Sequence, residues 1–450
     1  MKPSLTPAEL FAPTQRLAAM HRLVAARLPG DSGGRQAVHT VYGGAHLFRA
    51  DTAVRLGALA LKALDEYAPT PADLAAAIDL PPGLTDDVYA HVREKLTREP
   101  VEDFRVDFED GYGNRPDTEE DGHAVSAAEE MARGLAQGTL PPFTGIRIKT
   151  LSAELAPRSL RTLDLFLTTL RAAAVGGAWP TGFVITLPKI VHPDAVAALA
   201  DVLDALEKKL SLAPGTVPIE LMIETPQSVF DAEGGAAAPG LVAAGKGRVG
   251  SAHFGTYDYT ASLDITAAHQ HMAHPSCDFA KHVLQVSLAG TGVRISDGAT
   301  NVLPVAPHRV AEGGPPLTAS QLEENRRVVH AAWRLHSSHV RHSLEGAYYQ
   351  GWDLHPAQLP TRYATVYAFF LEGLDAAAER LSNFVGKAAQ ATLVGEIFDD
   401  AATGQGLLNY FLRAINCGAI DEAEAVKRTG LTIEDIEGRS FLKILERRRG

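Results

Sequence analysis

The stretch VPIELMIETP, Val217 to Pro226, decides the fold of this chain. Its apolar run ends in Glu224, and Thr225-Pro226 stops it at once. A short run rich in Val, Ile and Leu that is bounded by proline is typical of a buried strand. This strand delivers a single carboxylate, Glu224, to its carboxyl end.

Similar strand-like runs recur along the chain, and most are bounded by Gly, Pro or Asp. Eight of them are found, at residues 37–43, 103–111, 144–150, 182–190, 217–225, 248–255, 292–298 and 351–356. The spacers at 159–175 and 194–210 carry apolar residues at helical intervals, and Asp194 is a candidate cap for the second. Strands that alternate with helices predict a parallel sheet, and eight of them predict an α/β fold of the (β/α)8 TIM-barrel type.

Two regions fall outside a plain barrel. Residues 50–100 form a helical insertion after the first strand, and residues 366–450 form a C-terminal helical extension in which we expect no further strand. We therefore divide the chain into a barrel domain, 1–365, and the extension, 366–450.

Composition narrows the class of protein. The net charge of -12 argues against nucleic acid as a partner. No segment reaches the roughly 18 apolar residues of a membrane span, and the N-terminus lacks the apolar core of a signal peptide. The two cysteines, Cys277 and Cys417, cannot form a disulfide framework, and we expect both to be buried. We expect a cytoplasmic protein.

Ionisable residues stand at the carboxyl ends of the predicted strands, where barrels of this type place their catalytic groups. They are Asp107, Glu109, Asp110, Arg147, Lys149, Lys189, Glu224, Asp258, Asp297 and His355. So many charges would be costly inside a packed core, but around the mouth of one barrel they form a site.

Carboxylates with few histidines and no cysteine favour a hard cation, Mg²⁺ or Mn²⁺. Glu224 and Asp258, on adjacent strands, supply the minimal pair of ligands. Arg147 offers a planar fork for a substrate carboxylate or enolate oxygen. Together they would stabilise the enolate that forms when a carbon–carbon bond of an oxo acid breaks.

Each assignment has a simpler alternative. Glu224 could form a salt bridge within the barrel, Asp258 could cap a helix, and Lys189 could be a solvated surface lysine. The carboxylates of DFEDGYG, residues 107–113, could form an acidic turn. His355 is more typical of a hydrogen-bonded core histidine. The irregular spacing of His269, His271 and His274 favours a polar loop over a metal cluster.

Seven motifs in one order carry a family resemblance. They are DFEDGYG (107–113), IRIKT (146–150), LPKI (187–190), LMIETP (221–226), FGTYDYT (254–260), ISDG (295–298) and DLHPAQLP (353–360). The series resembles the HpcH/HpaI aldolase and citrate lyase family over about residues 38–365. The match looks closest to the branch of the citrate lyase β-subunit and the malyl- or citramalyl-CoA lyases.

The resemblance implies a lyase that cleaves or forms a carbon–carbon bond with a divalent cation. It implies Glu224 and Asp258 as metal ligands and Arg147 and Glu109 as substrate-binding groups. It also places Glu109 and Asp110 beside the metal, either through water or as groups that orient its ligands. Arg147, Asp110, Lys189 and Asp297 are the candidate catalytic residues. It also implies a homo-oligomer, a trimer or a hexamer.

Two departures leave the substrate open. The insertion at 50–100 is longer than usual in the family, and Arg49 is only a weak counterpart of its CoA-binding basic residues. The expected substrate is a small hydroxy- or oxo-carboxylate, either free or as a CoA thioester. A malate-synthase-like Claisen condensation with an acyl-CoA and a non-catalytic carboxylate-binding barrel are the alternatives.

Overall fold

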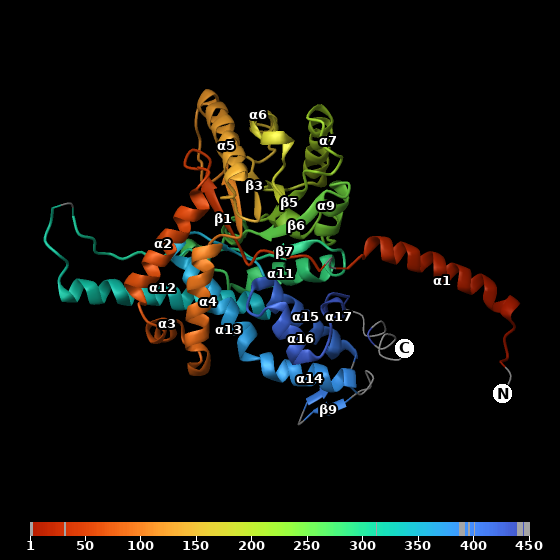
Figure 1. Cartoon of the computed structure of the whole chain (residues 1–450). Helices are drawn as coiled ribbons and strands as arrows, with labels where there is room; N and C mark the ends of the chain where they lie inside the picture. The colour runs from red at the N-terminus through yellow and green to blue at the C-terminus, as the bar shows by residue number, and fades with distance from the viewer. Residues whose placement is uncertain are drawn as a thin grey trace.

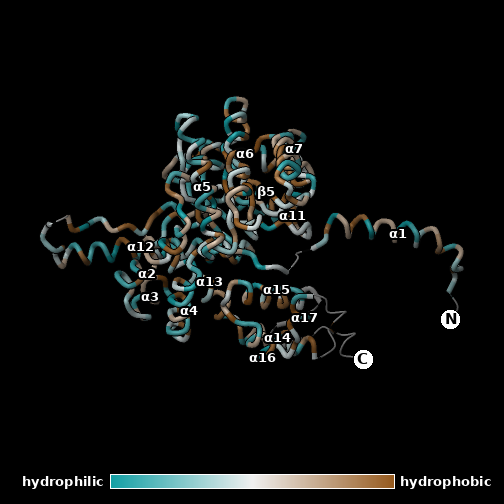
Figure 2. Tube along the Cα trace, turned by 45° about the horizontal axis from the view of Figure 1, so that its top comes forward, coloured by the Kyte–Doolittle hydropathy of each residue, from teal (hydrophilic) through white to brown (hydrophobic). Residues whose placement is uncertain are grey.

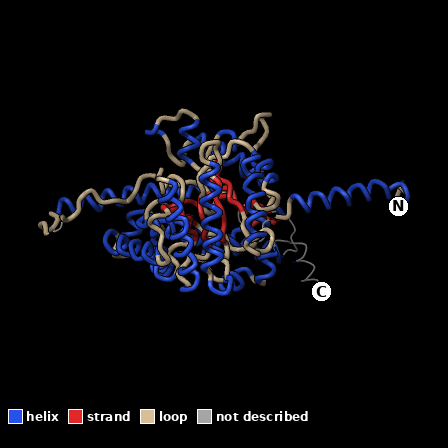
Figure 3. Tube along the Cα trace, turned by 90° about the horizontal axis from the view of Figure 1, so that it is seen from above, coloured by secondary structure: helices blue, strands red, loops and turns tan. Residues whose placement is uncertain are grey.

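The computed structural model describes residues 3–30, 33–311, 313–386, 392–394, 397–399, 401–438 and 444. Eight parallel strands form its centre, and helices surround them (Figures 1 and 3). The strands are β1 (His39–Gly44), β2 (Asp103–Asp107), β3 (Phe143–Arg147), β4 (Phe183–Leu187), β5 (Ile219–Ile223), β6 (Val249–Phe254), β7 (Arg294–Ser296) and β8 (Gly351–Asp353). Each of the eight predicted strands is confirmed.

The sheet closes into a barrel. Its order is β7-β6-β5-β4-β3-β2-β1-β8, so every strand up to β7 lies beside its sequence neighbour, and β8 pairs with β1. The seam between β7 and β8 is closed by a parallel bridge between Ala299 and Trp352. Two backbone bonds flank it, from Asp297 N to Gln350 O at 2.8 Å and from Trp352 N to Gly298 O at 3.1 Å. The (β/α)8 prediction is confirmed.

An outer ring of helices covers the barrel. It contains α5 (Asp117–Gln137), α6 (Ala156–Ala173), α7 (Pro193–Lys209), α8 (Pro226–Val229), α9 (Ala238–Ala244), α10 (Thr256–Ser262), α11 (Pro275–Leu288), α12 (Ala319–Glu345) and α13 (Leu359–Glu372). The apolar faces of these helices pack against the strands, as Phe166 and Leu170 of α6 show by their complete burial. The expected cap of α7 was wrong: His192 is the N-cap, and it accepts a hydrogen bond from Asp194 N.

Alternation along each strand separates an apolar outer face from a polar lumen. On β5, Ile219, Leu221 and Ile223 are fully buried hydrophobic residues. Glu220, between them, points inward: Arg105 of β2 reaches its carboxylate at 3.4 Å, although β2 and β5 are not neighbours in the sheet. Such a contact can only cross the lumen.

The lower half of the lumen is a paired ionic layer. Arg105 binds Asp103, and Glu220 accepts hydrogen bonds from Thr186 at 2.8 Å and from Ser251 at 2.9 Å. Burial raises the pKa of Asp103 to about 6, against the opposing effect of Arg105. Two carboxylates, Asp103 and Glu220, therefore share one guanidinium within the layer.

The region expected as an insertion contains α2 (Thr52–Tyr67), α3 (Pro71–Ile78) and α4 (Thr85–Arg98). The C-terminal region contains α14 (Leu374–Gly386), α15 (Ala401–Cys417), α16 (Glu422–Thr429) and α17 (Ile433–Gly438). The expectation that this region has no strand was wrong, because β9 (Thr392–Val394) and β10 (Ile397–Asp399) form a short antiparallel pair. The domain boundary at residue 365 stays a prediction; it falls within α13.

The N-terminal helix α1 (Pro7–Arg27) has no buried residue and extends away from the barrel (Figure 1). Its hydrophobic positions lie along the helix without other segments over them in Figure 2. No helix in the described ranges is long and apolar enough to span a membrane. Cys277 and Cys417 are both free and buried, as expected.

Candidate active site

Seven charged side chains meet at the carboxyl ends of the strands, and we call this group the acidic mouth. It consists of Asp107, Glu109, Asp110, Arg147, Lys189, Glu224 and Asp258. They come from five strand ends, β2 to β6, so only the closed barrel brings them together. Five carboxylates face two cationic groups, which leaves an excess of three negative charges when all are ionised.

The loop after β2 is built around Asp107. Its carboxylate accepts hydrogen bonds from Glu109 N at 3.0 Å and from Gly111 N at 2.8 Å. A Cβ atom at Gly111 would lie 2.6 Å from Asp107 Oδ2, so glycine is needed for this close approach. The turn suggested by the acidic motif exists, and it also presents Glu109 and Asp110 to the mouth.

Arg147 is held by a two-point ion pair. Its Nε and Nη2 donate to the two oxygens of Asp107 at 2.8 and 2.6 Å, and the side chain is only 2% exposed. The remaining nitrogen, Nη1, lies 3.3 Å from Glu109 Oε2. The guanidinium carbon is 4.9 Å from the ring centre of Tyr42 and 5.5 Å from that of Trp352. The fork is therefore fixed, with Nη1 on the side of the mouth.

Lys189 lies between the carboxylates. Its Nζ binds Glu109 and reaches Asp110 at 3.2 Å and Asp258 at 3.8 Å. Its backbone has a positive φ of 51°, which is uncommon for a residue with a side chain. In this conformation Lys189 N donates to Glu224 Oε1 at 2.7 Å. Lys189 is therefore part of the acidic mouth and not a solvated surface lysine.

Glu224 and Asp258 form an electrostatically unfavourable pair. Glu224 is 2% exposed, and burial, followed by the charge of Asp258, raises the pKa of Glu224 to about 8. Asp258 lies in the first turn of α10, whose N-cap is Gly255, so capping is not its role there. Burial also raises the pKa of Glu109. A proton on Glu224 or a bound cation would relieve this repulsion.

The residues fit a divalent cation by charge and by donor type. Within the described part of the chain, no three His, Cys, Asp or Glu side chains are placed as a ready metal cluster. Mg²⁺, however, usually takes only one or two protein carboxylates and completes its shell with water and substrate oxygens. Glu224 and Asp258 are the two carboxylates that would hold it.

Asp297 is not brought to the acidic mouth. It is fully buried, and its Oδ2 accepts hydrogen bonds from Lys281 of α11 at 3.0 Å and from Ser343 of α12 at 2.6 Å. Its neighbour Ser296 pairs in register with His253 on β6, so Asp297 faces the helices and not the lumen. A catalytic role for Asp297 has no support in this position.

Two of the histidines considered in the sequence analysis, His355 and His274, cap short helical turns or helices. His355 caps a short helical turn, η4 (Pro356–Gln358), and accepts a hydrogen bond from Ala357 N. His274 caps α11 and accepts from Ser276 N at 3.1 Å. The residues around His271 therefore form a loop and helix start, in agreement with the polar-loop interpretation.

Three lumen residues beneath the mouth escaped the motif analysis. Tyr42, His253 and Trp352 contact one another across the barrel, and Tyr42 and Trp352 flank Arg147. Burial lowers the pKa of His253 to about 4, so its ring is neutral near pH 7. Alternation along β1, β6 and β8 is the signal that could have found them.

The protein is thus a (β/α)8 barrel with an acid-rich mouth at the carboxyl ends of its strands, the fold class that the sequence predicted. The chain belongs to the family described as "Domain of unknown function (DUF6986)", which it matches over residues 17–444. No curated protein matches it.

Solved structures of the same fold include a citrate lyase from Burkholderia xenovorans LB400. That chain is 19% identical, with a TM-score of 0.52, and the match covers 76% of this chain and 92% of the lyase. A malate synthase from Haloferax volcanii is 14% identical, with a TM-score of 0.43 and coverage of 90% and 96%. The resemblance to the citrate lyase family is confirmed at the level of the fold.

Proposed function

We propose that this protein is a Mg²⁺-dependent carbon–carbon lyase that acts on a hydroxy- or oxo-carboxylic acid through an enolate. The observation that carries the proposal is the acidic mouth, which has more carboxylates than cationic groups. There Glu224 and Asp258 are close enough to raise the pKa of Glu224, and the guanidinium of Arg147 is fixed by Asp107. Mn²⁺ would satisfy the same oxygen ligands.

Arg147 would bind and orient the substrate. Asp107 occupies Nε and Nη2, so Nη1 is the donor that remains for a substrate carboxylate or carbonyl oxygen. Glu109 Oε2 lies 3.3 Å from Nη1 in this structure. A bound substrate would replace Glu109 at this nitrogen, and Glu109 would help to orient the substrate. The ion, when bound, would act as a Lewis acid for the enolate oxygen.

Asp110 is our candidate for the proton acceptor. Its side chain is 57% exposed at the mouth, so a substrate hydroxyl can reach it. In the cleavage direction, the hydroxyl gives its proton to Asp110, the carbinol carbon becomes a carbonyl, and the carbon–carbon bond breaks. The electron pair of that bond passes to the enolate of the second product. Lys189, 3.2 Å from Asp110, would hold the carboxylate in place.

The test is a product assay with the purified full chain and Mg²⁺. Hydroxy acids, free and as CoA thioesters, are supplied, and the release of pyruvate, glyoxylate, oxaloacetate or acetyl-CoA is followed with and without EDTA. An EDTA-sensitive product that Glu224→Gln abolishes supports the proposal. Thiol release from glyoxylate plus acetyl-CoA without any cleavage would indicate a condensing enzyme. Metal binding without turnover would indicate a binding protein.

The assembly and compartment stay predictions. A homo-oligomer, trimer or hexamer, and a cytoplasmic location were expected from the sequence. Sedimentation analysis of the full chain tests the first.

A further inference from the structure

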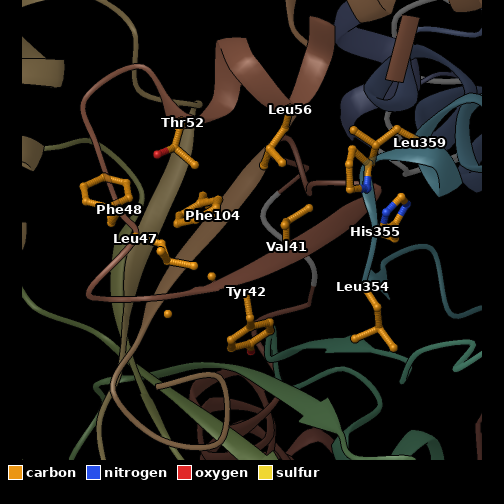
Figure 4. Close-up of a pocket in the computed structure, with 13 residues that line it drawn as sticks. Val41, Tyr42, Leu47, Phe48, Thr52, Leu56, Phe104, Leu354, His355 and Leu359 are labelled. Atoms are coloured by element: carbon orange, nitrogen blue, oxygen red, sulfur yellow. The ribbon is translucent and has the colours of Figure 1, made fainter. Parts of the chain in front are cut away.

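A cavity of about 190 Å³ opens beside the acidic mouth, between the outer face of the barrel and the inserted helix α2 (Figure 4). Its walls come from β1, β2, α2 and the loop after β8. Side chains around it include those of Val41, Leu47, Phe48, Leu56, Phe104 and Leu354. Leu47 and Leu354 are 67% and 39% exposed, so the cavity is reached from solvent.

Two residues of the cavity wall, Tyr42 and Gly44, contact the acidic mouth or its supporting loop. Tyr42 lines the cavity and also stacks on Arg147, with the guanidinium carbon 4.9 Å from its ring centre. Gly44 lines it as well, and a Cβ atom at Gly44 would lie 2.4 Å from the carbonyl oxygen of Gly111. Gly111 in turn donates to Asp107, the partner of Arg147. The carboxyl end of β1, which has no side chain at Gly43 and Gly44, is therefore the barrier between this cavity and the pair of Arg147 and Asp107.

The lining is unsuited to charged groups. Of the described residues that line the cavity, none carries a permanent charge, and only Tyr42, Thr52 and His355 have polar side chains. Burial lowers the pKa of His355, so its ring is neutral near pH 7. Arg49, the nearest basic candidate from the sequence, donates to the carbonyl oxygen of Phe48 and is not part of the lining. The described lining offers no cationic side chain to a phosphate or nucleotide.

We propose that this cavity binds an apolar substituent, an alkyl chain or an aromatic ring, of a substrate whose carboxylate is held at Arg147. The inference rests on the proposed function and narrows it to acids with a hydrophobic side group. The size agrees, since an apolar cavity of about 150 Å³ is enough to hold benzene. Burial of each methylene contributes about 0.8 kcal/mol, which corresponds to roughly fourfold in affinity.

The experiment measures binding, without turnover, to the full chain with Mg²⁺. Isothermal titration compares pyruvate with straight-chain 2-oxo acids up to 2-oxooctanoate, and benzyl alcohol serves as a probe without a carboxylate. The wild type is compared with Leu47→Asp and Leu354→Asp, which place a charge at the exposed rim. Leu59→Asp is the matched control, because Leu59 is 51% exposed on the same helix α2 but does not line the cavity.

We expect affinity to rise about fourfold per methylene until the cavity is full. The gain should disappear in the two rim variants and persist in Leu59→Asp. Equal affinity for all chain lengths, or a gain that survives in Leu47→Asp, overturns the inference and leaves the proposed function intact. Binding of benzyl alcohol at a Leu47-dependent site with no binding of any 2-oxo acid would instead reject the proposed function, and the substrate role of the cavity with it.

Discussion

The backbone N–H of Lys189 donates to Oε1 of Glu224 at 2.7 Å, and it does so from a left-handed conformation with a φ of 51°. One residue thus orients the proposed metal ligand with its main chain and fills the space among the carboxylates with its side chain. Strained backbone conformations of this kind persist where the surrounding structure fixes them, often at functional sites.

Replacing Glu224 with glutamine should abolish Mg²⁺ binding. The amide keeps the acceptor for Lys189 N but removes the negative charge that would bind the ion together with Asp258. We expect affinity to fall more than about 100-fold, beyond the 10- to 100-fold typical of outer partners of a metal site. Titration calorimetry measures it, and an unchanged affinity would remove Glu224 from the proposed ligands.

Glu224→Gln should also remove part of the pH dependence of the free energy of unfolding. The pKa of Glu224 is raised to about 8 in the folded protein from an ordinary value of 4.5. The folded state therefore binds more protons than the unfolded state between these values, and metal-free protein loses stability as the pH rises through this window. In EDTA, Glu224→Gln should melt at a higher temperature than the wild type at pH 9 and at the same temperature at pH 4. Melting curves that stay parallel across this range would contradict the assignment.

Replacing Lys189 with methionine should strengthen Mg²⁺ binding and weaken activity. The ammonium group competes with the ion for Glu109, Asp110 and Asp258, so its removal leaves a more negative site. Lys246→Met is a close control, because Lys246 has a φ of 54° and an ion pair with Asp201 far from the mouth. Equal Mg²⁺ affinity in Lys189→Met and the wild type would show that the ammonium group does not compete.

Replacing Asp107 with asparagine should destabilise the fold and weaken substrate binding together. Arg147 would remain as a buried charge with half its pairing lost, and breaking such a pair costs on the order of 3 kcal/mol. Asp201→Asn breaks only the exposed pair with Lys246 and should stay within about 1 kcal/mol. Urea unfolding of both variants distinguishes the two cases; equal losses would mean that the Arg147 pair contributes no more than a surface bridge.

The sequence was informative about strands and about the residues at their ends. Apolar runs bounded by Pro, Gly and Asp located all eight strands, and six of the seven candidate site residues do converge at the mouth. Asp297 did not, because strand side chains alternate with a period of two. Ser296 takes the lumen side of β7, and the next residue must face the helices.

Other features depend on contacts that only the folded chain forms. The left-handed conformation of Lys189 allows its backbone N–H to bind Glu224, and Tyr42 stacks on Arg147. Both contacts join residues that are far apart in the sequence. The choice of His192 over Asp194 as a helix cap is decided by local geometry that both residue types can satisfy. The spacing of residues in the sequence does not predict such contacts.

The seam between β7 and β8 gives the barrel an uneven resistance to opening. One bridge, Ala299 to Trp352, and two flanking hydrogen bonds stand here, whereas β2 and β3, for example, share a ladder of five consecutive residue pairs. Trp352 belongs both to this seam and to the aromatic wall around Arg147. Local opening of the barrel would therefore start at this seam and would first disturb the packing of Trp352 on the guanidinium of Arg147. Hydrogen exchange at Trp352 N would report how often the substrate-binding arginine loses this support.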